Sequence, residues 1–209
     1  VLLTSRRTGK LSTVSMTGSD ITQGANPDSA LIANVLAGGS RVATVTYSVA
    51  NAPDGSIDTL VFRAHAIGSF ATTDSGLHIV TLTKPVVTVV KSVNPSGTQI
   101  PGTDLTYTTT ISNAGGAKAE TVVHVDTLPT SLGFKVGSVS VTLPCGMLGP
   151  VTYSNDGGAT WNYTPVSAGC GAPADYDYCV RDIRVSLGDA QGSMGPNKVV
   201  EIVFIPKLK

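Results

Sequence analysis

The stretch LTYTTTISNAGG, residues 105–116, decides the fold of this chain. Leu105, Tyr107, Thr109 and Ile111 alternate with three threonines, so every second side chain falls on the same side of an extended backbone. This period-two alternation is typical of a strand with one face buried and the other in solvent. The residues NAGG that follow favour a turn, because asparagine and glycine tolerate positive φ.

Similar alternation recurs along the chain. Ala43, Val45, Tyr47 and Val49 alternate with residues that are mostly polar. No stretch of a dozen residues carries a sustained apolar stripe of helical period, and we therefore predict an all-β fold. Turn residues separate the predicted strands at the spacing found in β-sandwiches. Further strands are predicted at residues 60–62, 79–83, 86–90, 121–125, 139–143, 183–187 and 199–205.

The sequence also contains an internal repeat. The strand pattern that ends at Asn51 aligns without a gap with the pattern that ends at Asn113, and Asp58 then aligns with Glu120. Each copy is predicted to be a hairpin of two alternating strands joined by a short polar turn. An isolated hairpin cannot bury its apolar face, so each copy requires further strands around it. The repeat therefore predicts two tandem immunoglobulin-like β-sandwich modules.

The boundary between the modules is predicted at Lys84-Pro85. Pro85 lies between two strand patterns, where its missing N–H costs little. Residues 31–84 are predicted to form a divergent immunoglobulin-like module, and residues 85–209 a second module. Residues 1–30 are weakly patterned, and they fit either an N-terminal arm or the first strand and a long loop of the first module.

The composition excludes several classes of protein. Charged residues make up 13% of the chain, about half the usual share, and the formal net charge is zero. No basic stripe with interleaved aromatic residues is present, so nucleic acid is not an expected partner. No apolar run is long enough to span a bilayer. A weakly charged surface repels its own copies poorly, which suits a surface that neighbouring molecules cover.

The three cysteines, Cys145, Cys170 and Cys179, lie in the last third of the chain. They form no C-x-x-C pair and no cluster with histidine, so a zinc site is not expected. A disulfide between Cys170 and Cys179 would close a short loop, as in an exported protein. Pairing of Cys145 with Cys170 and three reduced thiols are the alternatives that the sequence leaves open.

Few residues suggest a metal or catalytic site. Asn155 with Asp156, and Asp54 with Asp58, are weak calcium candidates, because calcium requires six to eight oxygen ligands and neither pair supplies enough carboxylates. No cofactor is expected. Nothing in the sequence arranges a nucleophile with a base, or selects a pair of carboxylates for glycoside hydrolysis, and we predict that the chain is not an enzyme.

Four other residues of the second module carry a structural or a functional prediction. Trp161 and Tyr153 are predicted to pack in or over the core, the alternative being an exposed platform for a carbohydrate. His124 lies in an alternating strand, out of phase with the valines on either side, and is predicted to face solvent. Asn162 begins an N-glycosylation sequon.

A family resemblance lies in residues 86–129 and continues to residue 209. Its motifs are VTVVK from residue 87, IPGTDLTY from 100, ISNAG from 111, VDTLP from 125 and VTYSNDGGATW from 151. In this order they resemble the immunoglobulin-like repeat of bacterial and archaeal surface proteins that is catalogued as domain of unknown function eleven. The insertion between Cys170 and Cys179 departs from that pattern, as does the presence of one full copy. The resemblance implies a role in a cell surface, sheath, envelope layer or stalk, without catalytic residues.

Two functions follow from these observations as expectations. The first is a structural subunit of an extracellular filament, sheath or surface layer, in which copies of the chain assemble through strand edges or by exchange of the N-terminal arm. Leu11, Val14 and Met16 are the arm's expected anchors. The second is a spacer or adhesive module of a larger cell-surface protein, which binds a glycan or a protein through its loops, with the Cys170 to Cys179 insertion as the first place to look.

Lys91 is also a candidate for a covalent cross-link. Some pilin modules join a lysine of the first strand to an asparagine or aspartate by an isopeptide bond. Lys91 lies in the first strand of the second module, but Glu201 occupies the position in the last strand where an acceptor amide is expected. The sequence therefore gives little support to such a bond.

Overall fold

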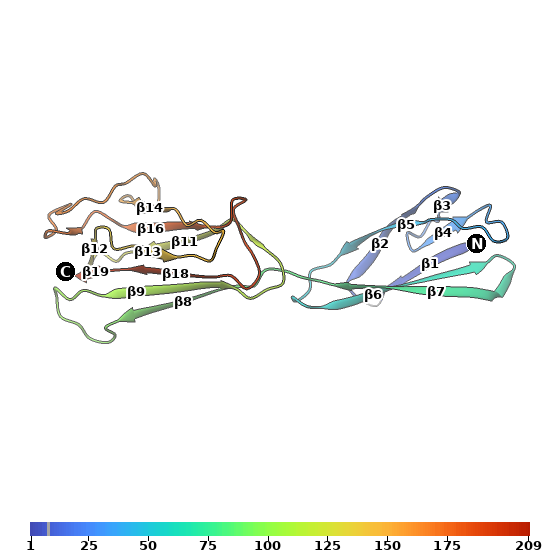
Figure 1. The fold of residues 1–209 in the computed structure, drawn as a ribbon, viewed down its shortest axis with the longest axis horizontal. Helices are drawn as coiled ribbons and strands as arrows, with labels where there is room; N and C mark the ends of the chain where they lie inside the picture. Colours follow the sequence, from blue (N-terminus) through green and yellow to red (C-terminus); the bar gives the residue numbers. More distant parts are fainter. Residues whose placement is uncertain (8) are drawn as a thin grey trace. The chain divides into compact units, whose positions relative to one another are not determined.

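The computed structural model describes residues 1–7 and 9–209, and this part of the chain contains strands and no helix (Figure 1). All the strand pairs are antiparallel. The predicted all-β fold is thus confirmed. The chain divides into two compact units, Val1–Thr83 and Lys84–Lys209, and each is described by itself below.

Unit 1 contains a five-stranded sheet, in the order β3-β4-β1-β6-β7, and a two-stranded sheet of β2 and β5. Its buried side chains include Leu11 and Met16 from β2 and Leu60 from β6. The strands of unit 1 are β1 (Leu2–Arg7), β2 (Leu11–Thr17), β3 (Ile21–Gln23), β4 (Ser29–Ile32), β5 (Thr44–Val49), β6 (Ile57–Ala66) and β7 (Ser69–Thr81).

The first 30 residues belong to the sheets of unit 1. Strand β1 lies between β4 and β6 and pairs with both, and β2 pairs with β5. Of the three expected arm anchors, Leu11 and Met16 are 0% and 1% exposed inside this unit, whereas Val14 is 54% exposed. Within the described structure, strands β1 and β2 of this segment are therefore paired inside the sheets of unit 1.

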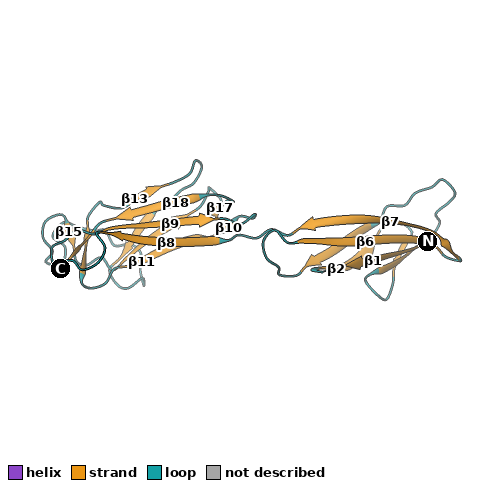
Figure 2. Ribbon diagram, turned by 90° about the horizontal axis from the view of Figure 1, so that it is seen from below, coloured by secondary structure: helices purple, strands orange, loops and turns teal. Residues whose placement is uncertain are grey.

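Unit 2 is built around two facing sheets. Figure 2 shows β13, β18, β9 and β8 side by side in one sheet, and β11, β16 and β14 form the other. Small sheets of β12, β15 and β19 and of β10 and β17 complete the unit. Its strands are β8 (Val87–Asn94), β9 (Thr106–Asn113), β10 (Ala119–Glu120), β11 (Val122–Thr127), β12 (Leu132–Lys135), β13 (Ser140–Thr142), β14 (Val151–Ser154), β15 (Tyr176–Asp177), β16 (Asp182–Leu187), β17 (Ser193–Met194), β18 (Val199–Phe204) and β19 (Pro206–Leu208).

The core of unit 2 fills the space between these sheets. Ile111 of β9 and Ile202 of β18 pack in one cluster with Val185 of β16, and a second cluster surrounds Phe134 of β12. Alternate residues of β9 are buried, as the opening motif predicted. This arrangement is the aligned packing of two sheets that a β-sandwich requires.

The internal repeat has a different geometry from the predicted hairpins. β5 pairs with β2 while β6 pairs with β1 and β7, and β9 pairs with β8 and β18 while β11 pairs with β16. In both units the two strands of the repeat therefore lie in different sheets. The short connection crosses from one sheet to the other, and the prediction that each copy is a hairpin was wrong.

Candidate binding and assembly sites

The disulfide predicted between Cys170 and Cys179 is present, with a Cα–Cα distance of 5.5 Å, and Cys145 is a free, exposed cysteine. The bond closes the long loop between β14 and β16, which also contains β15. A disulfide of this kind is consistent with an oxidising, extracellular environment.

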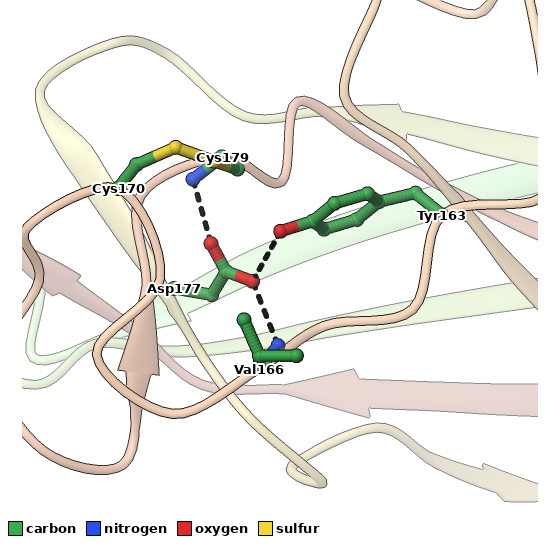
Figure 3. The surroundings of a disulfide bond; sticks show 5 residues. All are labelled: Tyr163, Val166, Cys170, Asp177 and Cys179. Atoms are coloured by element: carbon green, nitrogen blue, oxygen red, sulfur yellow. Dashed lines mark hydrogen bonds between the residues drawn. A yellow bond between two sulfur atoms is a disulfide. The ribbon is translucent and has the colours of Figure 1, made fainter.

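A buried carboxylate organises the inside of this loop (Figure 3). The Asp177 side chain is 0% exposed. Its Oδ2 accepts hydrogen bonds from the Tyr163 hydroxyl at 2.7 Å and from the Val166 backbone N–H at 2.8 Å, and its Oδ1 accepts one from the Cys179 N–H at 2.8 Å. A Cβ on residue 169 would collide with this carboxylate, which explains the glycine at that position.

The same carboxylate lies within 4.8 Å of the two cysteine sulfurs, a group with the composition of a metal site. The sulfurs are bonded to each other, however, and a zinc ion requires them as free thiolates. The Asp177 oxygens also already accept three hydrogen bonds. The chemistry of these residues is therefore that of a cross-linked, hydrogen-bonded loop and does not fit a metal ion while the disulfide is closed.

The contact with Asp177 predicts a pH dependence. Burial, and next the hydrogen bond to Asp177, raise the pKa of Tyr163 to about 12. The folded protein favours the neutral phenol of Tyr163, and this preference stabilises the folded state. The stabilisation is complete below about pH 10, the ordinary tyrosine pKa, and it is lost as the pH rises through the pKa of Tyr163 in the folded protein. Spectrophotometric titration of tyrosinate in wild-type and Tyr163→Phe protein identifies the ionisation of Tyr163, which we expect well above pH 10. A Tyr163 phenol that ionises near pH 10 in the folded protein contradicts the assignment.

The weak calcium candidates have structural roles. The Asp156 carboxylate accepts hydrogen bonds from the Ser154 hydroxyl and from the N–H and hydroxyl of Thr160, which lowers the pKa of Asp156 to about 2. Asp58 is buried in unit 1, where it accepts hydrogen bonds from the backbone N–H groups of Lys10 and Leu11. In the described residues, none of Asp54, Asp58 and Asp156, the last of which follows Asn155, belongs to a group of three histidine, cysteine or carboxylate side chains close enough to hold a metal ion.

A shallow hollow beside the disulfide carries positive charge. It is lined by Asn155, Tyr178, Arg181, Lys209 and the disulfide itself. Lys209 Nζ lies 4.1 Å from the centre of the Tyr178 ring, and burial, followed by the nearby Arg181, lowers the pKa of Lys209. The Nη1 atom of Arg181 is buried and has no hydrogen-bond partner among the described residues. The hollow thus places two cationic side chains, Arg181 and Lys209, beside the disulfide.

The aromatic residues of unit 2 lie in two different environments. Tyr153 packs against Phe134, with ring centroids 5.3 Å apart, at the edge of the second core cluster. Trp161 is half-buried, and the Arg184 guanidinium lies 4.5 Å from the centre of its ring. This ring face is already covered, so it is not open to a carbohydrate.

His124 lies in a different position from the one predicted. Val123 and Val125 are about half exposed, whereas the His124 side chain is 13% exposed and its Nε2 lies 3.9 Å from Asp126 Oδ2. The strand register explains the difference, because His124 is opposite the buried Val185 of β16. The inward face of β11 therefore carries a histidine and an aspartate.

One side of unit 1 is open. β5 pairs only with β2, and β7 only with β6, within the described part of the chain. Tyr47 of β5 and His78 of β7 approach each other across this side, with 3.3 Å between the Tyr47 hydroxyl and His78 Nε2. The groove there is mostly apolar, and its lining consists of Leu3, Ala43, Val45, Tyr47, Phe62 and His78. We call this feature the β5–β7 groove.

No protein-family model matches the sequence, and no curated protein matches it. The fold and the loop define the class as a disulfide-bonded, all-β protein built of sandwich-like sheets. Membership of the surface-repeat family, which the motifs of unit 2 suggest, stays a prediction. None of the described segments forms a helix long and apolar enough to cross a membrane.

Proposed function

We propose that the chain is a structural subunit of an extracellular filament, sheath or surface layer, whose copies assemble through the exposed edges of their sheets. The observation that supports this proposal best is the β5–β7 groove. It combines two strand edges that have no partner among the described residues with a mostly apolar lining, in which the described residues include no Asp, Glu, Lys or Arg. We propose no catalytic role.

A strand from a second copy matches the chemistry of this groove. Its backbone N–H and C=O groups would pair with the free edge of β5 or β7, and its alternate side chains would contact Val45 and Phe62. Unpaired edges of this length are a liability for a protein that stays monomeric, because they invite pairing with other chains. The outer face of β7 adds to the apolar surface, since Leu77 is 68% and Ile79 64% exposed.

Unit 2 has a comparable edge. β8 pairs only with β9 in the described structure, and Val87, Val89 and Val90 on β8 are between 42% and 66% exposed. This valine-rich edge strand is a suitable donor for the groove of another copy. The disulfide and the low content of charged residues support an extracellular location, and the motifs of unit 2 support a role in a cell surface.

Exchange of the N-terminal arm is a less suitable route to assembly. β1 lies in the middle of the five-stranded sheet, so exchange would require unit 1 to open between β4 and β6. Leu11 and Met16 already fill the interior of their own unit. The edges, in contrast, are available without any change in the fold.

The proposal predicts ordered assemblies that a charge in the groove prevents. Val45→Lys places an ammonium group among the apolar lining, and we expect negative-stain microscopy and light scattering to show discrete particles instead of the fibres or sheets of the wild type. Leu36→Lys is the matched control, because Leu36 is 77% exposed on a loop of the same unit outside the groove.

Discrete particles of the wild type under all conditions tested would overturn the assembly proposal. Assembly of Val45→Lys at the wild-type concentration would overturn the role of the β5–β7 groove, and the copies would then have to assemble through other strand edges. Circular dichroism of each variant checks that the fold is retained.

The cationic hollow supports a second function, as a spacer or adhesive module of a larger surface protein. Arg181 and Lys209 would bind a carboxylate or sulfate of a glycan, or an acidic side chain of a protein, in charge-assisted hydrogen bonds. In that case the microscopy described above shows isolated particles and no regular assembly.

A further inference from the structure

Lys91 connects the two main sheets of unit 2 at their open edge. It lies on β8, an edge strand of one sheet, and its Nζ atom is 2.7 Å from both carboxylate oxygens of Asp126 on β11, an edge strand of the other. No backbone pairing joins β8 to β11 in the described structure. The Lys91 and Asp126 side chains therefore make the link that hydrogen-bonded ladders do not.

The acceptor of this pair is buried, whereas the Lys91 side chain is 40% exposed. Asp126 is 6% exposed, and the Tyr107 and Phe204 rings lie 4.6 and 5.7 Å from Lys91 Nζ. Lys91 Nζ donates a hydrogen bond to Asp126 Oδ1. The other carboxylate oxygen, Oδ2, is equally close to Nζ but is buried and has no hydrogen-bond partner among the described residues. His124 Nε2, 3.9 Å from that oxygen, is likewise buried without a partner.

We propose that Lys91 and Asp126 form an intramolecular isopeptide bond, with His124 as the group that transfers protons. Because Nζ is 2.7 Å from both carboxylate oxygens, transfer of one proton from Nζ to the carboxylate gives a neutral amine beside a protonated carboxyl group. The neutral amine then attacks Cγ of the protonated carboxyl group, forming the Nζ–Cγ bond. One C–O bond breaks, one water leaves, and the product is an amide; no oxidant or reductant is involved.

His124 fits the role of proton carrier. Its Nε2 can take the proton that the nitrogen loses after attack and deliver it to the departing hydroxyl group, as in general acid–base catalysis. Burial lowers the pKa of His124; the Asp126 carboxylate opposes this effect and the Lys91 ammonium reinforces it. The imidazole is thus neutral near pH 7 and free to accept a proton.

The structure also shows why Glu201 does not serve as the acceptor. In the four-stranded sheet, Lys91 lies opposite Thr109, which lies opposite Ile202. Glu201 is the neighbour of Ile202 on β18, so its side chain points to the other face of the sheet. The acceptor comes from the facing sheet, and the bond would join the sheets covalently at the edge where backbone pairing is lacking. This inference is independent of whether the chain assembles.

Intact-protein mass spectrometry of the unreduced full chain tests the bond. The disulfide accounts for the loss of two hydrogens, and we expect a further loss of one water after incubation of the folded protein. Lys91→Arg keeps the ion pair but cannot form the amide, so its mass should show the disulfide alone. Fragmentation of a protease digest should yield a branched peptide that joins residues 91 and 126.

A wild-type mass that shows the loss of two hydrogens only would overturn the proposal, as would a loss of water that persists in Lys91→Arg. Circular dichroism confirms that this variant folds. His124→Ala tests the proton carrier separately: we expect bond formation to slow by about tenfold or more and to be restored by added imidazole. An unchanged rate in His124→Ala would remove His124 from the mechanism.

Discussion

Replacement of Asn113 by alanine is expected to lower the free energy of unfolding of unit 2 by about 3 kcal/mol, because it leaves several buried polar groups unpaired. The Asn113 side chain is 0% exposed, and all of its hydrogen-bonding capacity on this loop is used. Oδ1 accepts from the N–H groups of Val86 and Gly115, and Nδ2 donates to the carbonyls of Ala117 and Met194. One amide thus joins the start of unit 2 to the loop after β9 and to β17.

Urea unfolding followed by tryptophan fluorescence measures this effect, since the single tryptophan, Trp161, lies in unit 2. The matched control is Asn51→Ala, at the equivalent position of the internal repeat. Asn51 is exposed, so its replacement should leave the transition of unit 2 unchanged. Equal, small effects of the two substitutions would show that the hydrogen bonds of Asn113 contribute little beyond those that water supplies.

The period-two pattern predicted the strands and the buried face of β9 because that strand alternates clearly between large and polar side chains. Ile111 is 2% and Thr109 0% exposed, on the face that the pattern assigned to the core. The repeat, in contrast, predicted similar strands but not their partners. Pairing depends on residues far away in the sequence, so the crossing of each repeat from one sheet to the other was not evident.

β11 shows a second limit of the pattern. Its sequence VVHVDT places apolar residues on both faces of the strand. The register with β16 decides which of the two faces is turned toward the core. That register turns Asp126 and His124 inward, opposite Ile183 and Val185. With the valines of β11 predicted to face the core, His124 and Asp126 were expected in solvent, and the contact of Asp126 with Lys91 was not evident from the sequence.

The disulfide could be predicted because its cysteines are close in sequence and the loop is rich in turn-forming residues. The role of Asp177 could not, because Tyr163 and Val166 approach it only in the folded loop. A local signal did exist: an aspartate two residues before a cysteine can accept a hydrogen bond from the cysteine N–H, as in an Asx turn, and Asp177 does so with Cys179.

The structural role proposed above requires loops and edges that keep their shape, and unit 2 stabilises both with side chains. Asp177 and the disulfide hold the loop after β14, Asn113 holds the turn after β9, and Lys91 spans the open edge between the sheets. At the ends and edges of a sandwich few backbone hydrogen bonds join neighbouring strands, and these side-chain contacts stabilise the fold there. Their loss is therefore expected to affect stability more than the loss of an exposed charge.

Asp177→Ala should consequently destabilise unit 2 by about 3 kcal/mol, even with the disulfide intact. The substitution leaves the Tyr163 hydroxyl and the N–H groups of Val166 and Cys179 without their acceptor in the interior of the loop. Each buried donor without a partner costs about 1–3 kcal/mol, and relaxation of the loop toward water offsets part of the sum. The measurement is again urea unfolding by Trp161 fluorescence under non-reducing conditions.

Two further variants separate the hydrogen bonds from the charge. Asp177→Asn keeps one carbonyl oxygen and should give an intermediate loss, because its NH₂ group faces donors that it cannot satisfy. Glu120→Ala removes an exposed carboxylate from the same unit and should have little effect. If Asp177→Ala were as stable as Glu120→Ala, the disulfide alone would hold the loop, and the buried carboxylate would have to be explained by function. A loss confined to Asp177→Ala and Asp177→Asn would instead establish that the carboxylate is what gives this loop its fixed conformation.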